Sequence, residues 1–463
     1  MQNEINIFNT LTRRLEKFEA ISSNEVKIYS CGPTVYHYAH IGNLRAYVFA
    51  DILRRSFVYA GYNVKHVINI TDVGHLVGDG DEGIDKLEAG AVREGKTAKE
   101  IAEYYTEAFM KDLELLNIPK DKYIFPRATE HIPEQIELIK SLEEKGYTYK
   151  ISDGIYFDTS KFEHYADLAK LDIEGLKSGA RVEENKEKKN ITDFALWKFS
   201  PADSKRQMEW ESPWGVGFPG WHIECSAMSK KYLGSHFDIH TGGIDHIPVH
   251  HTNEIAQSEV ANGKKYVNYF MHINFLHDKS GKMSKSNEDF LRLDTLIAKN
   301  YSPLAFRYFL LMTNYRSEIS FSYDALISAS IAFNKLMNWC LENRTDGGAI
   351  NEEYKNKFDG FVFDDLNTPR ALAVIWDLIA DKNVNVADKY KTIISFDEIL
   401  GLGLVDIKKE IVEISNEVKE LLDARAIARK ANNWTESDRL RDEILKLGYI
   451  TKDTSNGQEI SKK

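Results

Sequence analysis

The chain has 463 residues, of which 43% are hydrophobic and 28% charged, and its formal net charge at neutral pH is −11. This composition is typical of a globular protein, and the length predicts about two to four domains. The negative charge argues against nonspecific binding of nucleic acid but leaves room for a specific RNA held by a local basic patch. No apolar run is long enough to span a membrane, and the first residues do not resemble a signal peptide. The three cysteines argue against a disulfide framework and fit a reducing, cytoplasmic location.

The first informative stretch is a strand, a turn-rich connection and a helix. Residues 26–30 predict a short buried strand, and residues 44–59 show the periodicity of a helix. The connection, residues 31–43, reads CGPTVYHYAHIGN. Its Gly42 allows a ligand to approach the backbone, and the helix start offers unpaired N–H groups with a partial positive charge. The connection therefore predicts a phosphate or nucleotide site, and its Cys31 and two histidines suggest a metal nearby.

The alternation of strand and helix patterns continues along the chain. A strand is expected at 64–70 and a helix at 97–116, which predicts a parallel sheet with ligands at the carboxyl ends of its strands. From 117 to 193 the pattern changes to short alternating pieces, which indicate an insertion. Sheet-like residues return at 236–240, followed by a helical pattern at 251–261. We therefore expect one nucleotide-binding sheet interrupted by an insertion.

The last third of the chain is helical in pattern. The expected helices cover residues 304–314, 323–343, 369–379 and 411–431. Residues from Asp453 onward are polar and are expected to be frayed.

A second informative stretch, residues 278–286, reads DKSGKMSKS. A glycine beside lysines and serines makes a cationic loop that can close over a triphosphate and stabilise a departing pyrophosphate. Alone, such a run is usually just exposed surface. Together with HIGN at residues 40–43, it resembles the paired ATP-binding signatures of class I aminoacyl-tRNA synthetases. Residues 282–286 match the family consensus, whereas the first signature usually ends in a second histidine, where this chain has Asn43.

Flanking blocks narrow the resemblance to cysteinyl-tRNA synthetases, in order over almost the whole chain. These blocks are CGPTVY at 31–36, NITD at 69–72, GWHIECSAM at 220–228, HHTNEIAQ at 250–257, DLNTP at 365–369 and LDAR at 422–425. The expected fold is α/β, with a Rossmann-like parallel-sheet catalytic domain split by an insertion and followed by an all-α C-terminal region. The expected divisions are a first half of the catalytic nucleotide-binding domain (1–116), a connective insertion (117–193), the second catalytic half (194–262), a stem-contact region carrying the 282–286 loop (263–315), a helical bundle (316–400) and an anticodon-binding region (401–463).

Metal-ligating residue types are scattered along the chain, which is typical of a site open to substrate rather than a zinc finger. They are Cys31, Cys225, His250 or His251, and Glu254. Either histidine can share a helix face with Glu254, so the spacing leaves both open; the family pattern implies His250. Cys31 and Cys225 lie in turn-flanked, non-periodic blocks that we place at strand ends. Cys340 lies in an apolar helical run and is expected to be an inert buried residue.

The resemblance implies one Zn²⁺ per chain and Mg²⁺ accompanying ATP. An apolar pocket separates cysteine from serine by only ~1–3 kcal/mol. A thiolate is a good ligand for zinc and a serine hydroxyl is a poor one, so a zinc ion bonded to the substrate sulfur would select cysteine.

The resemblance also implies roles for the remaining site residues. His40 and Asn43 would contact the ATP phosphates, and Gly42 would pack under the adenine. Lys282 and Lys285 would neutralise the leaving pyrophosphate. Two further residues, Thr34 and Trp221, would wall the amino-acid pocket.

The implied activity is attachment of L-cysteine to tRNA(Cys) through cysteinyl-adenylate, by a chain that the family suggests is a monomer. Arg425, Arg429 and Arg441 are candidates for contacts to RNA. One alternative is a ligase that passes activated cysteine to a small amine sugar, which would not need the helical C-terminal third. Another is a zinc-dependent RNA-binding relative without catalysis, which Asn43 favours and the intact 282–286 loop opposes.

Overall fold

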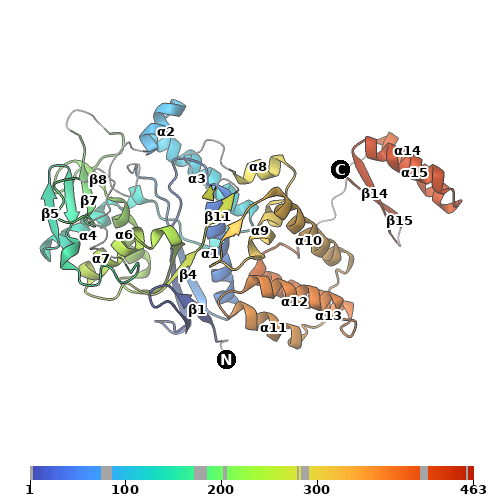
Figure 1. Cartoon of the computed structure of the whole chain (residues 1–463), viewed down its shortest axis with the longest axis horizontal. Helices are drawn as coiled ribbons and strands as arrows, with labels where there is room; N and C mark the ends of the chain where they lie inside the picture. The colour runs from blue at the N-terminus through green and yellow to red at the C-terminus, as the bar shows by residue number, and fades with distance from the viewer. Residues whose placement is uncertain are drawn as a thin grey trace. The chain divides into compact units, whose positions relative to one another are not determined.

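The computed structural model describes residues 4–74, 86–170, 185–201, 206–278, 281–282, 291–406, 415–454 and 457–462 (Figure 1). The chain divides into two compact units, residues 1–405 and 406–463. None of the helices that the structure describes is long and apolar enough to cross a membrane.

The centre of the first unit is a four-stranded parallel sheet in the order β10-β9-β3-β4. Its strands are β3 (Glu25–Ser30), β4 (Asn63–Ile68), β9 (Phe237–Gly243) and β10 (Val267–Ile273). Helix α1 (Ile41–Tyr59) connects β3 to β4 and is buried along most of its length. The expected parallel sheet is confirmed, and its strands come from two stretches far apart in the chain. Because the strands are parallel, their carboxyl ends meet at one edge of the sheet.

The segment between β4 and β9 forms helices and a second, antiparallel sheet in the order β5-β6-β7-β8. Its elements are α2 (Lys86–Glu94), α3 (Ala98–Leu115), α4 (Ile132–Glu144), β5 (Thr148–Ile151), β6 (Gly154–Phe157), β7 (Phe194–Phe199), β8 (Gly217–Pro219) and α6 (Trp221–Leu233). Helix α7 (His250–Asn262) follows β9 and packs beside α4 and α6 (Figure 1). Aromatic side chains such as Trp197 and Phe157 join this part to the core of the parallel sheet.

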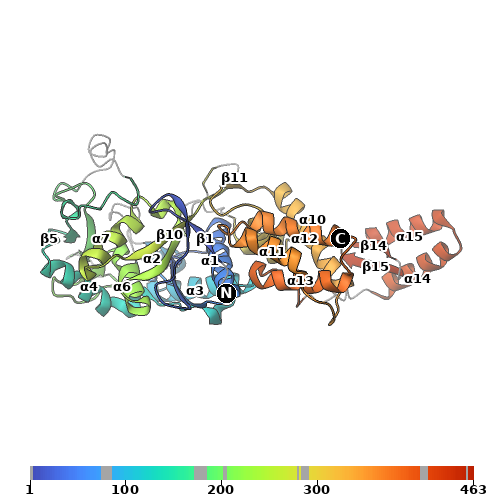
Figure 2. The ribbon, with the colours of Figure 1, turned by 90° about the horizontal axis from the view of Figure 1, so that it is seen from below.

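The rest of the first unit is mainly helical (Figure 2). After β10 come β11 (Leu276–Asp278), β12 (Gly281–Lys282), α8 (Leu293–Ala298), α9 (Pro303–Leu311), β13 (Ile319–Ser320), α10 (Tyr323–Glu342), α11 (Glu352–Val362), α12 (Thr368–Ala380) and α13 (Val386–Leu400). A hairpin of β1 (Asn6–Asn9) and β2 (Arg14–Lys17) starts the unit. Cys340 is buried in α10, as expected.

A buried carboxylate joins α1 to the helical part. Asp51 accepts from Arg307 at 2.7 Å and from Arg55 at 2.6 Å, and Arg307 also donates to carbonyls at the ends of α3 and α13. Burial alone would raise the pKa of Asp51, but the guanidinium groups of Arg307, Arg55 and Arg54 lower it to about 2. Gly401 fits under this network because a Cβ there would lie 2.5 Å from Nη2 of Arg307.

The second unit contains α14 (Asn416–Lys430), α15 (Trp434–Lys446) and a hairpin of β14 (Tyr449–Thr454) and β15 (Gly457–Lys462). The helices agree with the predicted C-terminal region, but the expectation of a frayed polar end is wrong. Asp453 accepts two hydrogen bonds from Arg425, at 2.8 and 2.9 Å, and Gln458 accepts a third at 2.8 Å. The polar residues of the tail are thus partners of a buried arginine. Arg425, whose side chain is 1% exposed, holds the hairpin and is not on the surface for RNA.

Candidate active site at the carboxyl ends of the sheet

A cleft of about 310 Å³ lies at the carboxyl edge of the parallel sheet, where the ends of β3, β9 and β10 meet the starts of α1, α6 and α7. Most of the site residues expected from the sequence line it. They are Cys31, Thr34, His40, Gly42, Asn43, Trp221, Cys225 and His250. The structure therefore brings the residues of the candidate nucleotide and metal sites to one cavity.

Helix α1 begins at Ile41, three residues before the predicted start, because His40 and Asn43 cap each other. The Nδ1 atom of His40 accepts from the backbone N–H of Asn43 at 3.0 Å, and the side-chain oxygen of Asn43 accepts from the backbone N–H of His40 at 3.3 Å. This reciprocal pair is a capping box. Since Nδ1 accepts, a neutral His40 carries its proton on Nε2. The Asn43 oxygen serves the cap, so its NH₂ group is the part that can donate to a ligand.

Two overlapping groups of four side chains have ligand atoms that all lie within 4.8 Å of one another. One contains Cys31, Cys225, His250 and Glu254, and the other contains Cys31, His240, His251 and Glu254. The first group has two thiols, an imidazole and a carboxylate, a set that suits zinc. Cys31, Cys225 and His250 line the cleft, whereas His240 and His251 do not appear in its lining. The first group is therefore the one that a substrate in the cleft can reach.

Two members of the first group, His250 and Glu254, contact each other and also side chains outside the group. Glu254 has one oxygen 3.1 Å from Nε2 of His250, and its other oxygen accepts from Tyr266 at 2.9 Å and lies 3.0 Å from Nε2 of His240. The Nδ1 atom of His250 lies 2.9 Å from Nδ1 of His222. Such outer contacts orient the atoms that would face a metal.

A chain of buried histidines continues behind the cleft. Nε2 of His251 lies 3.2 Å from the sulfur of Cys31, and its Nδ1 lies 2.8 Å from His272, which in turn bonds Thr10. Burial lowers the pKa of His251 and of His272 well below the usual range, so both rings are neutral. No role is predicted from the sequence for His222, His240 or His272. The signal that could have found the last two is a histidine inside a buried strand, because such polar side chains need partners.

Cys225 is buried and Cys31 is half-buried at the cleft, an arrangement that suits a cation between the two sulfurs. Burial raises the pKa of the Cys31 thiol well above its usual range, so a thiolate there calls for a nearby positive charge. Cys225 was expected at a strand end and instead lies in the second turn of α6, where it is buried. The turn-rich residues before α6 gave no helical pattern, so the helix that carries Cys225 was not predicted.

Two family models together match most of the chain. Residues 17–331 match the class I (C) tRNA synthetase catalytic domain, and residues 412–460 match the cysteinyl-tRNA ligase anticodon binding domain. The chain belongs to the cysteinyl-tRNA ligase family.

Full-length relatives agree with this membership. The chain is 50% identical over 455 residues to cysteine–tRNA ligase 1 of Burkholderia lata, covering 98% of this chain and 96% of the relative. It is 44% identical over 482 residues to cysteine–tRNA ligase of Treponema denticola, covering 97% and 98%.

Solved structures with the same fold include two tRNA synthetases. Mycobacterium tuberculosis methionyl-tRNA synthetase bound by methionyl-adenylate aligns with a TM-score of 0.56 and 16% identity, over 82% of this chain and 91% of that one. The Agrobacterium radiobacter K84 LeuRS–tRNA–LeuAMS ternary complex aligns with a TM-score of 0.57 and 11% identity, over 84% of each chain. These likenesses support the class I synthetase fold.

Of residues 282–286, the second motif of the sequence analysis, the structure describes only Lys282. Lys282 ends β12, which pairs with β11, while Lys285 lies outside the described residues. Helix α1 contacts the chain on both sides of residues 282–286. The backbone N–H of Ile41 donates to the carbonyl of Leu291 at 2.9 Å, and a Cβ on Gly42 would lie 3.6 Å from the carbonyl oxygen of Leu276. The edges of the two signatures are therefore neighbours.

Proposed function

We propose that this chain attaches cysteine to tRNA(Cys) in an ATP-dependent reaction that proceeds through cysteinyl-adenylate. The observation that carries the proposal is the convergence of Cys31, Cys225 and His250 on the cleft that also contains His40 and Asn43. A thiol-binding end and a phosphate-binding end in one cavity suit a substrate that bears both a sulfur and a carboxylate to be activated.

At the nucleotide end, His40 and the NH₂ group of Asn43 donate to the ATP phosphates. The His40 donor is Nε2–H, since its Nδ1 accepts from the helix backbone. The start of α1 adds a partial positive charge. Gly42 lies under the adenine, and Lys282 and Lys285 stabilise the departing pyrophosphate, with Mg²⁺ accompanying ATP.

At the thiol end, we propose that Cys31, Cys225, His250 and Glu254 hold one zinc ion. The fit rests on the donor set, on the spread of its atoms within 4.8 Å, and on the contacts that orient His250 and Glu254. A bound zinc would offer the substrate sulfur a soft ligand site that a serine hydroxyl fills poorly.

Thr34 and Trp221 wall the amino-acid pocket between the two ends. Trp221 starts α6, and its ring lies 4.3 Å from the ring of His250. Thr34 forms a parallel bridge with Thr71, next to the end of β4. These contacts fix both side chains in the wall of the cleft, where they limit the size of the substrate.

The second unit is the proposed contact to the tRNA anticodon. Arg429 and Arg441 are 35% and 50% exposed, although each also pairs with an aspartate. The match of residues 412–460 to an anticodon binding domain disfavours transfer to a small amine sugar. The intact 282–286 motif disfavours a relative without catalysis. The six-part domain division, the monomeric state and the cytoplasmic location remain predictions.

The test has two steps. Cysteine-dependent exchange of pyrophosphate into ATP should be detectable with zinc-loaded protein, and its absence would reject both ligase functions. Charging of a tRNA with the cysteine anticodon should exceed transfer to small amines such as amino sugars. The reverse preference would favour the alternative ligase.

A further inference from the structure

Arg45 is a buried cation one turn after the helix cap, and the roles proposed above do not use it. Arg45 is 3% exposed. Within the described part of the chain, no carboxylate lies at ion-pair distance from it, unlike Arg307, which pairs with Asp51. Burial lowers the pKa of Arg45 to about 10, so the guanidinium is still charged at neutral pH. A charge kept in this position calls for an explanation, because burying an unpaired cation is costly.

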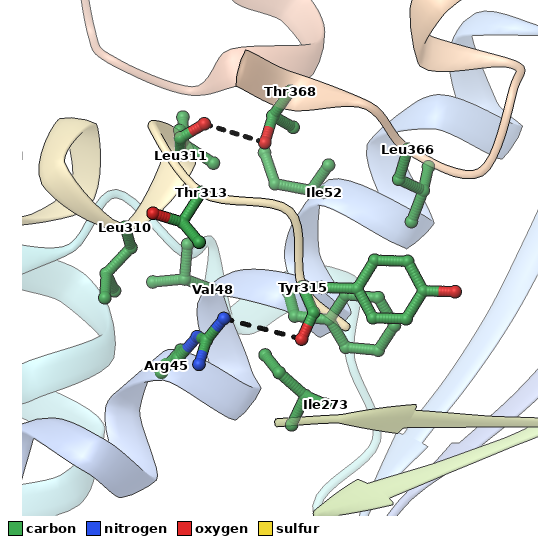
Figure 3. A pocket seen from close by; sticks show the side chains of 11 residues that line it. Arg45, Val48, Ile52, Ile273, Leu310, Leu311, Thr313, Tyr315, Leu366 and Thr368 are labelled. Carbon is green, nitrogen blue, oxygen red and sulfur yellow. Dashed lines mark hydrogen bonds between the residues drawn. The ribbon is translucent and has the colours of Figure 1, made fainter. Parts of the chain in front are cut away.

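Backbone carbonyls of two separate loops replace the missing carboxylate. Nη1 of Arg45 donates to the carbonyls of Asn274 and Phe275 at 2.7 and 2.6 Å. Nη2 donates to those of Asn314, Tyr315 and Ser317, at 3.2, 3.4 and 2.6 Å. Figure 3 shows the guanidinium group reaching from α1 to the loop of Tyr315. One planar fork thus bridges two loops, which a lysine ammonium cannot do at the same points.

Both loops lead to strands of the small sheet β12-β11-β13, which carries Lys282. Asn274 and Phe275 link β10 of the central sheet to β11, which pairs with β12 and its Lys282. The second loop leads into β13, which pairs in parallel with β11. The guanidinium group therefore lies between the start of α1 and the base of the β11–β12 pair.

A small gap remains in the packing at this junction. A cavity of about 30 Å³ lies beside Arg45, and its walls are mostly apolar (Figure 3). They include Val48 and Ile52 of α1, Ile273 of β10 and Leu310 of α9. The ring of Phe49 in α1 stacks on Tyr315 at 4.5 Å, and the backbone N–H of Asn274 joins the two loops by donating to the carbonyl of Tyr315. The five hydrogen bonds of Arg45 add directional contacts from α1 to both loops.

We propose that Arg45 is a positioning residue for ATP activation, which holds the His40–Asn43 helix start and the strand pair carrying Lys282 at a fixed separation. The inference rests on the proposed function, since it concerns the alignment of ATP between the two signatures. A transition state that needs donors from both sides is sensitive to their spacing, and a misplacement of about 1 Å costs on the order of 10²-fold in rate.

The experiment compares Arg45→Lys with Arg307→Lys. Both arginines are buried and donate to carbonyls, but Arg307 does so at the junction of α1, α3 and α13. Pyrophosphate exchange gives kcat and KM for ATP and for cysteine, while thermal unfolding and zinc content report folding. We expect Arg45→Lys to lower kcat about 10²-fold, with the KM for cysteine and the zinc content unchanged. Arg307→Lys should lower the melting temperature at least as much and change kcat only a few-fold.

The outcomes separate the two proposals. If wild-type protein exchanges pyrophosphate and Arg45→Lys keeps its kcat, the positioning role is wrong and the proposed function stands. It is also wrong if both variants lose kcat in proportion to their loss of melting temperature, because Arg45 is then only structural. If wild-type protein shows no exchange, the proposed function fails. The positioning role is then judged by ATP affinity in calorimetry, which Arg45→Lys must weaken more than Arg307→Lys.

Discussion

The two ends of the cleft differ in how their residues are positioned. At the thiol end, two of the candidate ligands are oriented by hydrogen bonds from neighbouring side chains. At the nucleotide end, the residues are positioned by the helix backbone and by a junction between loops. His250 is oriented by His222, and Glu254 is oriented by Tyr266 and His240. At the nucleotide end, the described donors are the two residues of a helix cap. Arg45 bonds the loops that lead to β11 and β13 to the same helix.

This difference follows from the two tasks. Choosing a thiol over a hydroxyl requires a fixed set of ligand atoms, and the buried contacts of His250 and Glu254 orient part of that set. Stabilising a departing pyrophosphate requires charges and N–H groups aimed at atoms that move during the reaction. Removal of a ligand at the thiol end should therefore abolish zinc binding, while a substitution at the nucleotide end should lower the rate of pyrophosphate exchange to an extent that depends on the substitution.

Cys225→Ser is expected to have the largest effect. It removes one of the two thiols of the first ligand group, so zinc content should fall well below one per chain. Cysteine-dependent exchange should fall by more than about 100-fold, since changes even around a metal site cost ~10–100-fold. Discrimination against serine should fall as well. Cys340→Ser, a buried control in α10, should keep its zinc. Unchanged metal content in Cys225→Ser would show that the ligand set is wrong.

His250→Asn and His251→Asn decide between the two ligand groups. His250 faces the cleft and should be needed for stoichiometric zinc, measured by elemental analysis. His251 contacts Cys31 from behind, so His251→Asn should keep the zinc and weaken its affinity by about 10–100-fold. Retained zinc in His250→Asn together with lost zinc in His251→Asn would favour the second group.

Much of the sheet and of the cleft could be predicted because their signals are local. The strand expected at 26–30 is β3, one residue longer at its start, and β6 lies among the short alternating pieces expected between 117 and 193. The motif residues of the cleft follow strand ends, and parallel strands bring such residues together whatever lies between them in the chain. Cys31, which follows β3, and His250, which follows β9, are therefore near one another for a reason visible in the sequence.

Other features depend on partners that a sequence pattern does not reveal. The start of α1 was missed because histidine is not among the preferred N-cap residues, and here its ring nitrogen does the capping. The terminal hairpin was missed because its polar residues pair with Arg425 across a long stretch of chain. The role of Arg45 is hidden for the same reason, since all its acceptors are distant backbone carbonyls.

Asn43→Asp separates the two uses of Asn43 at the nucleotide end. Aspartate can still accept from the backbone N–H of His40, and a negative charge suits the first turn of a helix, so the melting temperature should be kept. The carboxylate cannot donate to phosphate and repels it, so kcat of pyrophosphate exchange should fall by about 10²-fold.

Asn43→Ala is the matched variant. It loses the side-chain half of the capping box that Asn43 supplies, while His40 still accepts from the backbone N–H of residue 43, so stability should fall by at most about 1 kcal/mol. It also loses one donor without adding a charge, so its exchange rate should fall less than that of Asn43→Asp, by about 10-fold. Wild-type exchange in Asn43→Asp would mean that Asn43 serves only the helix.

Asp112→Asn should give the smallest change, a small rise in melting temperature. Asp112 lies in α3 and feels the charge of Asp294 in α8. Burial, and then the charge of Asp294, raise the pKa of Asp112 from 3.8 to about 7. The folded protein therefore keeps a proton that the unfolded chain loses, so stability falls as pH rises from about 4 to about 7 and stays lower above that. Asparagine removes this cost, and the melting temperature at pH 8 should rise by about 2 °C. The gain should shrink as the pH is lowered toward 4. Asp121→Asn, at an exposed carboxylate paired with Lys122, should show no such gain, and an equal gain in both variants would mean that general surface charge is responsible.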